Sequence, residues 1–75
     1  MKINIEIGEW AAKHTQTGTF PLEVPSGATV DDVIAMLNLP PGEVGLAAVA
    51  GKHVARGHAL KGGDNIKFFP CIVGG

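Results

Sequence analysis

A change in hydrophobic periodicity near residue 26 restricts the fold more than any other feature of the sequence. Residues 2–7 (KINIEI) and residues 19–25 (TFPLEVP) alternate apolar with other side chains, which predicts two strands that each bury one face. The apolar positions of residues 26–41 instead follow the spacing of one helix face: Val30, Val33, Ile34 and Leu37. We therefore expect a two-layer α+β fold, in which one main helix covers one face of a mixed sheet.

The expected helix carries signals at both ends. Thr29 stands where its side chain can cap the first turn, and Asp31 and Asp32 lie in that turn, where free backbone amides favour negative charge. Pro40 and Pro41 follow the apolar positions. Since proline cannot continue a helix, we expect these two residues to end it.

The second half of the sequence indicates short strands separated by glycine-containing turns. Residues 45–55 predict two short strands joined by a turn at Gly51-Lys52, and residues 59–65 predict a further turn. Residues 66–69 (IKFF) are the last predicted strand. Its alternate side chains should point inward at Ile66 and Phe68 and outward at Lys67 and Phe69.

Length, charge and hydropathy exclude several functions. With 75 residues, we expect a single domain over residues 1–75. The sequence contains six Lys and Arg residues and seven Asp and Glu residues, and it has no basic run. This charge balance argues against nucleic-acid binding. The apolar stretches are too short for a membrane span, and no apolar block of a signal peptide follows Lys2. Cys71 is the only cysteine, so we expect no disulfide framework and a cytoplasmic location.

We expect neither a metal site nor a resident cofactor. His14, His53 and His58 are scattered, and their spacing does not match a zinc motif. A chain this short also leaves little room for a pocket with a convergent nucleophile and base. The sequence therefore predicts a protein without an active site of its own.

The chain ends on FFPCIVGG, an apolar segment followed by two glycines. Together with the element order before it, this ending resembles the ubiquitin-like β-grasp sulfur carriers. That family includes the small subunit of molybdopterin synthase (MoaD), which is the closest match, and the thiamine-pathway carrier ThiS. The likeness spans nearly the whole chain and rests on Thr29-Val30, Ala47-Ala48-Val49, Leu60, Gly63-Asp64, Phe68-Phe69-Pro70 and Gly74-Gly75.

The resemblance implies that the C-terminal carboxylate of Gly75 is the reactive group. In such carriers an ATP-dependent activating enzyme (MoeB/ThiF-like) forms an acyl-adenylate on the last glycine, and a sulfur donor converts it to a thiocarboxylate. A flexible tail over residues 70–75 would carry this group into the partner, and glycines without a Cβ can pass through a narrow channel. The residues expected to thread are Gly74, Val73, Ile72, Cys71 and Pro70.

The leading interpretation is a carrier that donates sulfur in molybdopterin (molybdenum or tungsten cofactor) biosynthesis. Its second partner would be the large subunit of molybdopterin synthase or another sulfur acceptor enzyme. Sulfur delivery to thiamine thiazole or to tRNA, and ubiquitin-like modification of lysines, are the alternatives, because the same adenylation chemistry serves all of them. The Phe-Phe-Pro sequence favours the pterin branch.

Phe69, His53 and Cys71 are three further residues of interest. Phe69 should serve as a docking anchor for a partner, although isolated aromatic side chains also occur on surfaces without a role. By the resemblance, His53 stands where the family usually has an apolar interface residue, and it is either a solvated strand residue or a pH-sensitive partner contact. Cys71 replaces what is commonly a second proline, and we interpret it as a small apolar side chain that sulfur transfer does not need.

Overall fold

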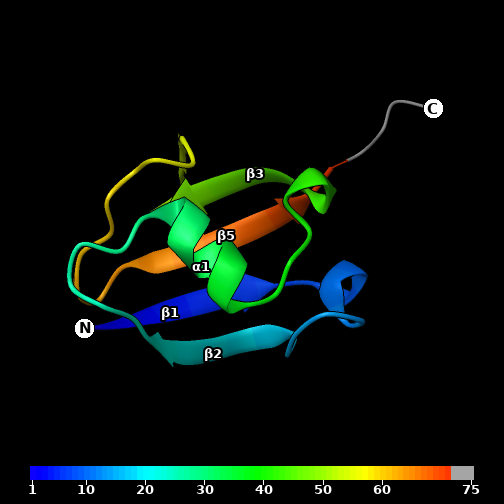
Figure 1. Ribbon diagram of the computed structural model, residues 1–75, viewed down its shortest axis with the longest axis horizontal. Coiled ribbons are helices and arrows are strands. Elements are labelled where there is room, and N and C mark those ends of the chain that lie inside the picture. The colour runs from blue at the N-terminus through cyan, green and yellow to red at the C-terminus, as the bar shows by residue number, and fades with distance from the viewer. Residues whose placement is uncertain (72–75) are drawn as a thin grey trace.

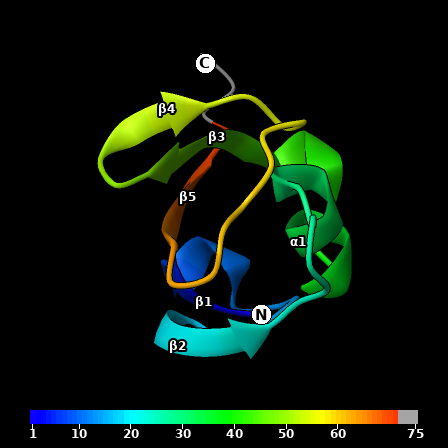
Figure 2. The same ribbon diagram turned by 90° about the vertical axis from the view of Figure 1, so that its left-hand side faces the viewer.

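The computed structural model describes residues 1–71, which form a five-stranded mixed sheet and one α-helix. In chain order the elements are β1 (Lys2–Ile7), the 3-10 turn η1 (Glu9–Ala11), β2 (Gly18–Glu23), α1 (Val30–Met36), the 3-10 turn η2 (Pro41–Glu43), β3 (Val44–Val49), β4 (Lys52–Val54) and β5 (Asn65–Pro70). The helix α1 lies across one face of the sheet (Figure 1), and the side view shows it on that face only (Figure 2). This arrangement confirms the expected α+β fold.

The first and last strands are neighbours in the middle of the sheet. The strand order is β2-β1-β5-β3-β4, with β1 and β5 parallel and the other pairs antiparallel. The edge strand β2 contains Pro21, which is exposed. Proline has no backbone N–H to donate to a neighbouring strand, and an edge strand tolerates this because it is paired on one side alone. The edge of the sheet therefore accommodates this proline.

The core lies between α1 and the sheet face beneath it. Ile3, Ile5, Val30 and Val33 have no exposed surface, and Ile34 is only 2% exposed. The inward positions read from the sequence are thus confirmed for both periodicities. Burial of each such side chain contributes roughly 1.5–3 kcal/mol to folding.

The start of α1 follows the sequence-based expectation closely. The Thr29 hydroxyl accepts a hydrogen bond from the Asp32 backbone N–H (3.3 Å), and the Thr29 N–H donates to the Asp32 carboxylate (2.9 Å). This reciprocal pair is a capping box, in which the two side chains satisfy two backbone N–H groups at the start of the helix. Thr29 is therefore confirmed as the cap.

The end of α1 corrects the expectation that Pro40 and Pro41 terminate it. The helix ends at Met36, and Asn38 follows with a left-handed φ of 58°. The Asn38 N–H donates to Ala35 O (3.0 Å) and the Leu39 N–H to Ile34 O (3.1 Å), the two bonds of a Schellman motif. Pro41 instead begins η2.

The hairpin turn between β3 and β4 also lies one residue earlier than expected. Val49 pairs with Lys52, so the turn residues are Ala50 and Gly51, both at positive φ (52° and 79°), and Lys52 belongs to β4. Two successive positive φ angles fit the right-handed twist of a two-residue hairpin. The turn geometry, rather than the glycine alone, therefore fixes the register.

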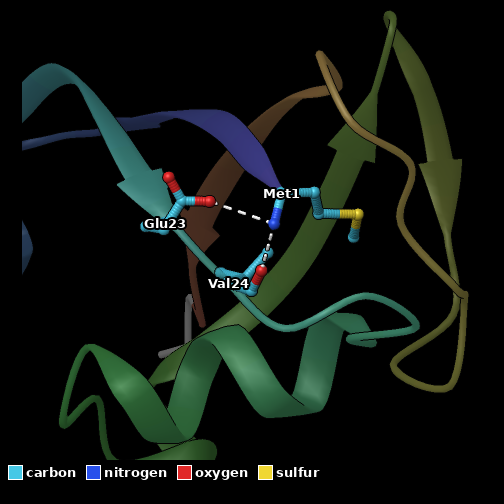
Figure 3. Close-up of polar contacts among 3 residues, drawn as sticks. All are labelled: Met1, Glu23 and Val24. Atoms are coloured by element: carbon cyan, nitrogen blue, oxygen red, sulfur yellow. Dashed lines mark hydrogen bonds and ion pairs between the residues drawn. The ribbon is translucent and has the colours of Figure 1, made fainter.

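The first residue is tied to the end of β2 (Figure 3). The Met1 amino group donates to Val24 O (2.6 Å) and lies 3.0 Å from a carboxylate oxygen of Glu23, while the Val24 N–H donates back to Met1 O (2.8 Å). These contacts extend the β1–β2 pairing by one residue.

As for membranes, α1 and the other helical segments of residues 1–71 lack the length and apolar character to cross a bilayer.

Candidate functional site

The candidate site begins on β5, which carries the chain to one end of the sheet (Figure 1). β5 is hydrogen-bonded to β1 on one side and to β3 on the other. Its inward residues Ile66 and Phe68 are 1% and 2% exposed, so the expected alternation of this strand is confirmed. The segment that precedes the tail is therefore held on three sides.

Pro70 and Cys71, here called the tail root, remain attached to the domain. Pro70 is the last residue of β5 and pairs with Val44, and the Cys71 N–H donates to Glu43 O at 2.8 Å. Pro70, expected as the first residue of the tail, therefore belongs to the strand instead. Ile72, Val73, Gly74 and Gly75 lie outside the described residues, so their part in threading stays a prediction.

A glycine makes the close approach at the tail root possible. A Cβ at Gly45 would lie 2.6 Å from Pro70 O and 3.0 Å from the Cys71 Cα, closer than side-chain carbons approach backbone atoms. The pairing of β3 with β5 shifts register at this residue, between Val44 and Leu46. Gly45 is thus a bulge residue that brings β3 directly against the tail root.

The segment of residues 41–45 under the tail root is itself held by two side chains from other parts of the chain. Nη2 of Arg56 donates to Pro41 O (2.7 Å) and to Val44 O (2.6 Å). The His14 Nε2 lies 3.4 Å from Oε1 of Glu43. The sequence pattern does not indicate these roles of Arg56 and Glu43, because contacts between separate loops leave no periodic signal.

The sheet face opposite α1, here called the open face, carries the residues predicted to contact a partner. The register places Leu46 beside Phe69, and Ala48 beside both Lys67 and His53. Phe69 is half-buried and His53 is exposed. Both lie on the same face, and their contact with a partner stays a prediction.

Electrostatic contacts fix part of the open face. The Lys67 Nζ lies 3.2 Å from a carboxylate oxygen of Glu6 and 5.2 Å from the centroid of the Phe69 ring. A cation at this distance from an aromatic face is attracted to it, so Lys67 helps to orient Phe69. Together with Asn4, Thr19 and Ala48, these three side chains line a shallow hollow.

Leu46 is a residue of this surface that the sequence analysis missed. It is 50% exposed, and it extends the apolar area beside Phe69. Regular alternation from the buried Val44 would have placed Leu46 inward, but the bulge at Gly45 shifts the alternation by one residue. A glycine at the start of a short strand was the only available signal.

Cys71 lies in the tail root, and Trp10 lies beside the core. The Cys71 side chain is exposed. Trp10 is half-buried, packs against the core, and lines a second hollow together with Phe69 and Pro70. Within residues 1–71, no group of three or more His, Cys, Asp or Glu side chains is close enough to bind a metal ion.

Comparison with protein-family models matches residues 9–75 to the model described as the ThiS family. A search of curated proteins found no significant match. Among solved structures, SAMP1 from Haloferax volcanii is 20% identical, with all of both chains covered and a TM-score of 0.74. An inferred molybdopterin converting factor subunit 1 from Pyrococcus furiosus is 23% identical over 96% of this chain and 99% of that one, with a TM-score of 0.76.

A ubiquitin-like protein from Caldiarchaeum subterraneum is 25% identical over 99% of this chain and 100% of that one, with a TM-score of 0.59. These structural similarities show that the fold is the ubiquitin-like β-grasp, as the resemblance implied. The family match begins in η1 and runs through β5 to the final glycines. It therefore includes the tail root and the open-face residues of β3, β4 and β5, but not those of β1.

Proposed function

We propose, since this chain belongs to the ThiS family of ubiquitin-like sulfur carriers, that it carries sulfur as a thiocarboxylate on Gly75 and donates it in molybdopterin biosynthesis. Proteins of this family are carriers rather than catalysts, and the family implies an E1-like activating enzyme as a partner. For this chain we propose an ATP-dependent enzyme (MoeB/ThiF-like), acting in the cytoplasm. The proposed second partner is the large subunit of molybdopterin synthase.

The observation that supports this function best is the position of the tail root. The chain leaves the sheet at Cys71, at the end of a central strand and not in the interior of the domain. Four residues follow, through Gly75. At the length of an extended chain they reach at most about 14 Å, enough to enter a pocket of a docked enzyme.

The chemistry requires little from the carrier beyond delivery of its terminus. An oxygen of the Gly75 carboxylate attacks the α-phosphorus of ATP, pyrophosphate leaves, and the acyl-adenylate forms. A sulfur nucleophile then attacks the glycyl carbonyl carbon and displaces AMP, which leaves the thiocarboxylate. Because glycine has no Cβ, this carbonyl is open to attack on both faces.

The apolar residues before the two glycines suit reversible binding. Ile72 and Val73 would each gain roughly 1.5–3 kcal/mol when fully buried in a partner. The entropic cost of ordering the bound segment offsets part of this gain. A carrier that visits two enzymes in turn needs such moderate affinity.

Two findings favour the pterin branch over the other acceptors. Phe68-Phe69-Pro70 resembles the molybdopterin synthase small subunit. The similar structure from Pyrococcus furiosus also bears a description as an inferred molybdopterin converting factor subunit. Thiamine thiazole and tRNA remain the alternative acceptors, since they would accept sulfur from the same thiocarboxylate.

The proposal is tested by incubating the chain with an activating enzyme, ATP and a sulfur donor. We expect a mass increase of about 16 Da, as sulfur replaces one terminal oxygen, measured by intact-protein mass spectrometry. The matched control is the chain without Gly75, which should stay unmodified. Addition of the large subunit and a pterin precursor should then return the carrier to its original mass. A thiocarboxylate that forms but is not consumed would contradict the pterin assignment alone.

Protein modification is a second candidate, favoured by the similarity to SAMP1. One of the similar structures is described as small archaeal modifier protein 1 from Haloferax volcanii, at 19% identity over 95% of this chain and 98% of that one. A modifier would form an amide bond between Gly75 and a lysine of another protein. Tryptic digestion of a cell extract should then leave residues 68–75 (FFPCIVGG) attached to lysines, because Lys67 is the last basic residue, and these remnants should be absent when Gly75 is deleted.

A further inference from the structure

The Arg56 side chain connects the loop after β4 with the segment of residues 41–45. It is half-buried, and its Nη2 donates to the carbonyl oxygens of Pro41 (2.7 Å) and Val44 (2.6 Å). Its own backbone carbonyl accepts a hydrogen bond from the Asp31 N–H (2.9 Å) in the first turn of α1. Arg56 is therefore fixed at one end by the helix, and it fixes the segment at the other end.

Within residues 1–71, that segment makes the backbone hydrogen bond nearest the C-terminal end. Glu43 lies between the two carbonyl groups that Arg56 holds, and Glu43 O accepts the Cys71 N–H at 2.8 Å. Hydrogen bonds from a charged donor are shorter and stronger than bonds between neutral groups. The position of Cys71 thus depends on Arg56 through two bonds to the backbone around Glu43.

We propose that Arg56 is a positioning residue for the activation of Gly75, because it sets the point and direction in which the chain leaves Cys71. The inference rests on the proposed function. Since only four residues follow Cys71 in the sequence, the position and direction of the chain at Cys71 limit where the Gly75 carboxylate can reach. A misplacement of about 1 Å at a reacting group can reduce the rate by about a hundredfold.

The kinetic effect of this role differs from that of lost stability. Replacement of Arg56 leaves the open face and the tail sequence intact, so the carrier should still dock and KM should change little. A smaller share of the docked complexes would then hold the carboxylate in place, which lowers kcat. Partial unfolding would instead reduce the concentration of competent carrier and raise the apparent KM, with kcat unchanged at saturation.

The test is ATP–pyrophosphate exchange by the activating enzyme, with the full chain as the varied substrate. For Arg56→Ala we expect a fall in kcat of about tenfold or more, with KM within about threefold of the original. Arg56→Lys, which retains a charged donor, should give an intermediate kcat. The matched control Lys61→Ala removes one exposed positive charge before the start of β5, at the strand end opposite Cys71, and should change neither constant.

A second variant reaches the same tail root by another route. Gly45→Ala places a Cβ against Pro70 O and should lower kcat in the same way without touching Arg56. Amide hydrogen exchange gives an independent readout. The Cys71 N–H should exchange faster in Arg56→Ala, whereas the Phe68 N–H, further inside β5, should keep its rate.

Each outcome decides one of the two claims. If the unaltered chain supports no exchange with activating enzymes, the proposed function fails, and the inference falls with it. If the unaltered chain is active and Arg56→Ala has the same kcat, the inference alone is overturned, whatever the change in Tm. Should Arg56→Ala fail to fold, a normal kcat for both Arg56→Lys and Gly45→Ala would overturn it.

Discussion

The two faces of the sheet have different compositions although they share the same strands. Under α1 the side chains are apolar and buried, with Ile3 and Ile5 fully covered, whereas the open face combines the Lys67–Glu6 ion pair with the half-exposed Leu46. Phe68 and Phe69 are neighbours on β5 and point to opposite faces. The same residue type therefore serves the core at one position and a surface at the next.

The largest effect is expected on the covered face. Phe68→Ala removes a ring that is 2% exposed and leaves a cavity in the core, which should cost about 3–5 kcal/mol of unfolding free energy. A domain of this size has a total stability on the order of 5 kcal/mol. Denaturant titration followed by circular dichroism should therefore show a largely unfolded chain. A loss below about 1 kcal/mol would contradict the assignment of this face as the core.

The neighbouring Phe69 should show the opposite pattern. Phe69→Ala should cost less than about 1 kcal/mol of stability but weaken binding to the activating enzyme by about tenfold, as for an aromatic anchor in an interface. Isothermal titration calorimetry measures the affinity. Met36→Ala is the matched control, since Met36 is also exposed (44%) but lies on α1. Equal effects of the two variants on affinity would remove the distinction between the faces.

A smaller effect is expected at the N-terminal cap of α1. Thr29→Ala deletes the hydroxyl of the capping box and should cost about 1 kcal/mol of unfolding free energy. Thr29→Ser retains the hydroxyl and should recover most of that loss. Because Thr29 is remote from the open face, Thr29→Ala should lower the Tm of thermal unfolding and leave the affinity for the activating enzyme unchanged. A parallel loss of affinity would show that the two faces are coupled.

The smallest effect concerns the ion pair of the open face. Glu6→Gln removes the partner of Lys67, and since both side chains are about half exposed, stability should fall by about 0.5 kcal/mol or less. The difference from the unaltered chain should shrink as salt is added, because salt screens exposed charges. Denaturant titrations at low and high salt measure it. A difference that is independent of salt would mean that the contact is not electrostatic.

Local patterns predicted most of the fold. The strands β1, β2 and β5 and the cap of α1 follow from alternation and from the Thr29–Asp32 spacing, which act within a few residues. The end of α1 was misjudged because two stop signals compete. Asn38 accepts a left-handed φ two residues before Pro40, so it ends the helix first.

Contacts between distant segments were the part that the sequence could not predict. The exposure of Leu46 depends on the bulge at Gly45, which shifts the alternation of β3. The bonds of Arg56 join residues 12 and 15 positions apart, with no repeated spacing to indicate them. The direction of Phe69, in contrast, followed from the alternation of β5 alone.

The central place of β5 has a consequence for synthesis on the ribosome. In the sheet formed by residues 1–71, β5 lies between β1 and β3, and its residues 65–70 are translated after the other four strands. Pairing across such sequence separations also carries the entropic cost of closing long loops. We expect nascent chains that stop before β5 to remain open, so that degradation can remove them before an activating enzyme meets them. The sheet can therefore close only after residues 65–70 have been synthesised.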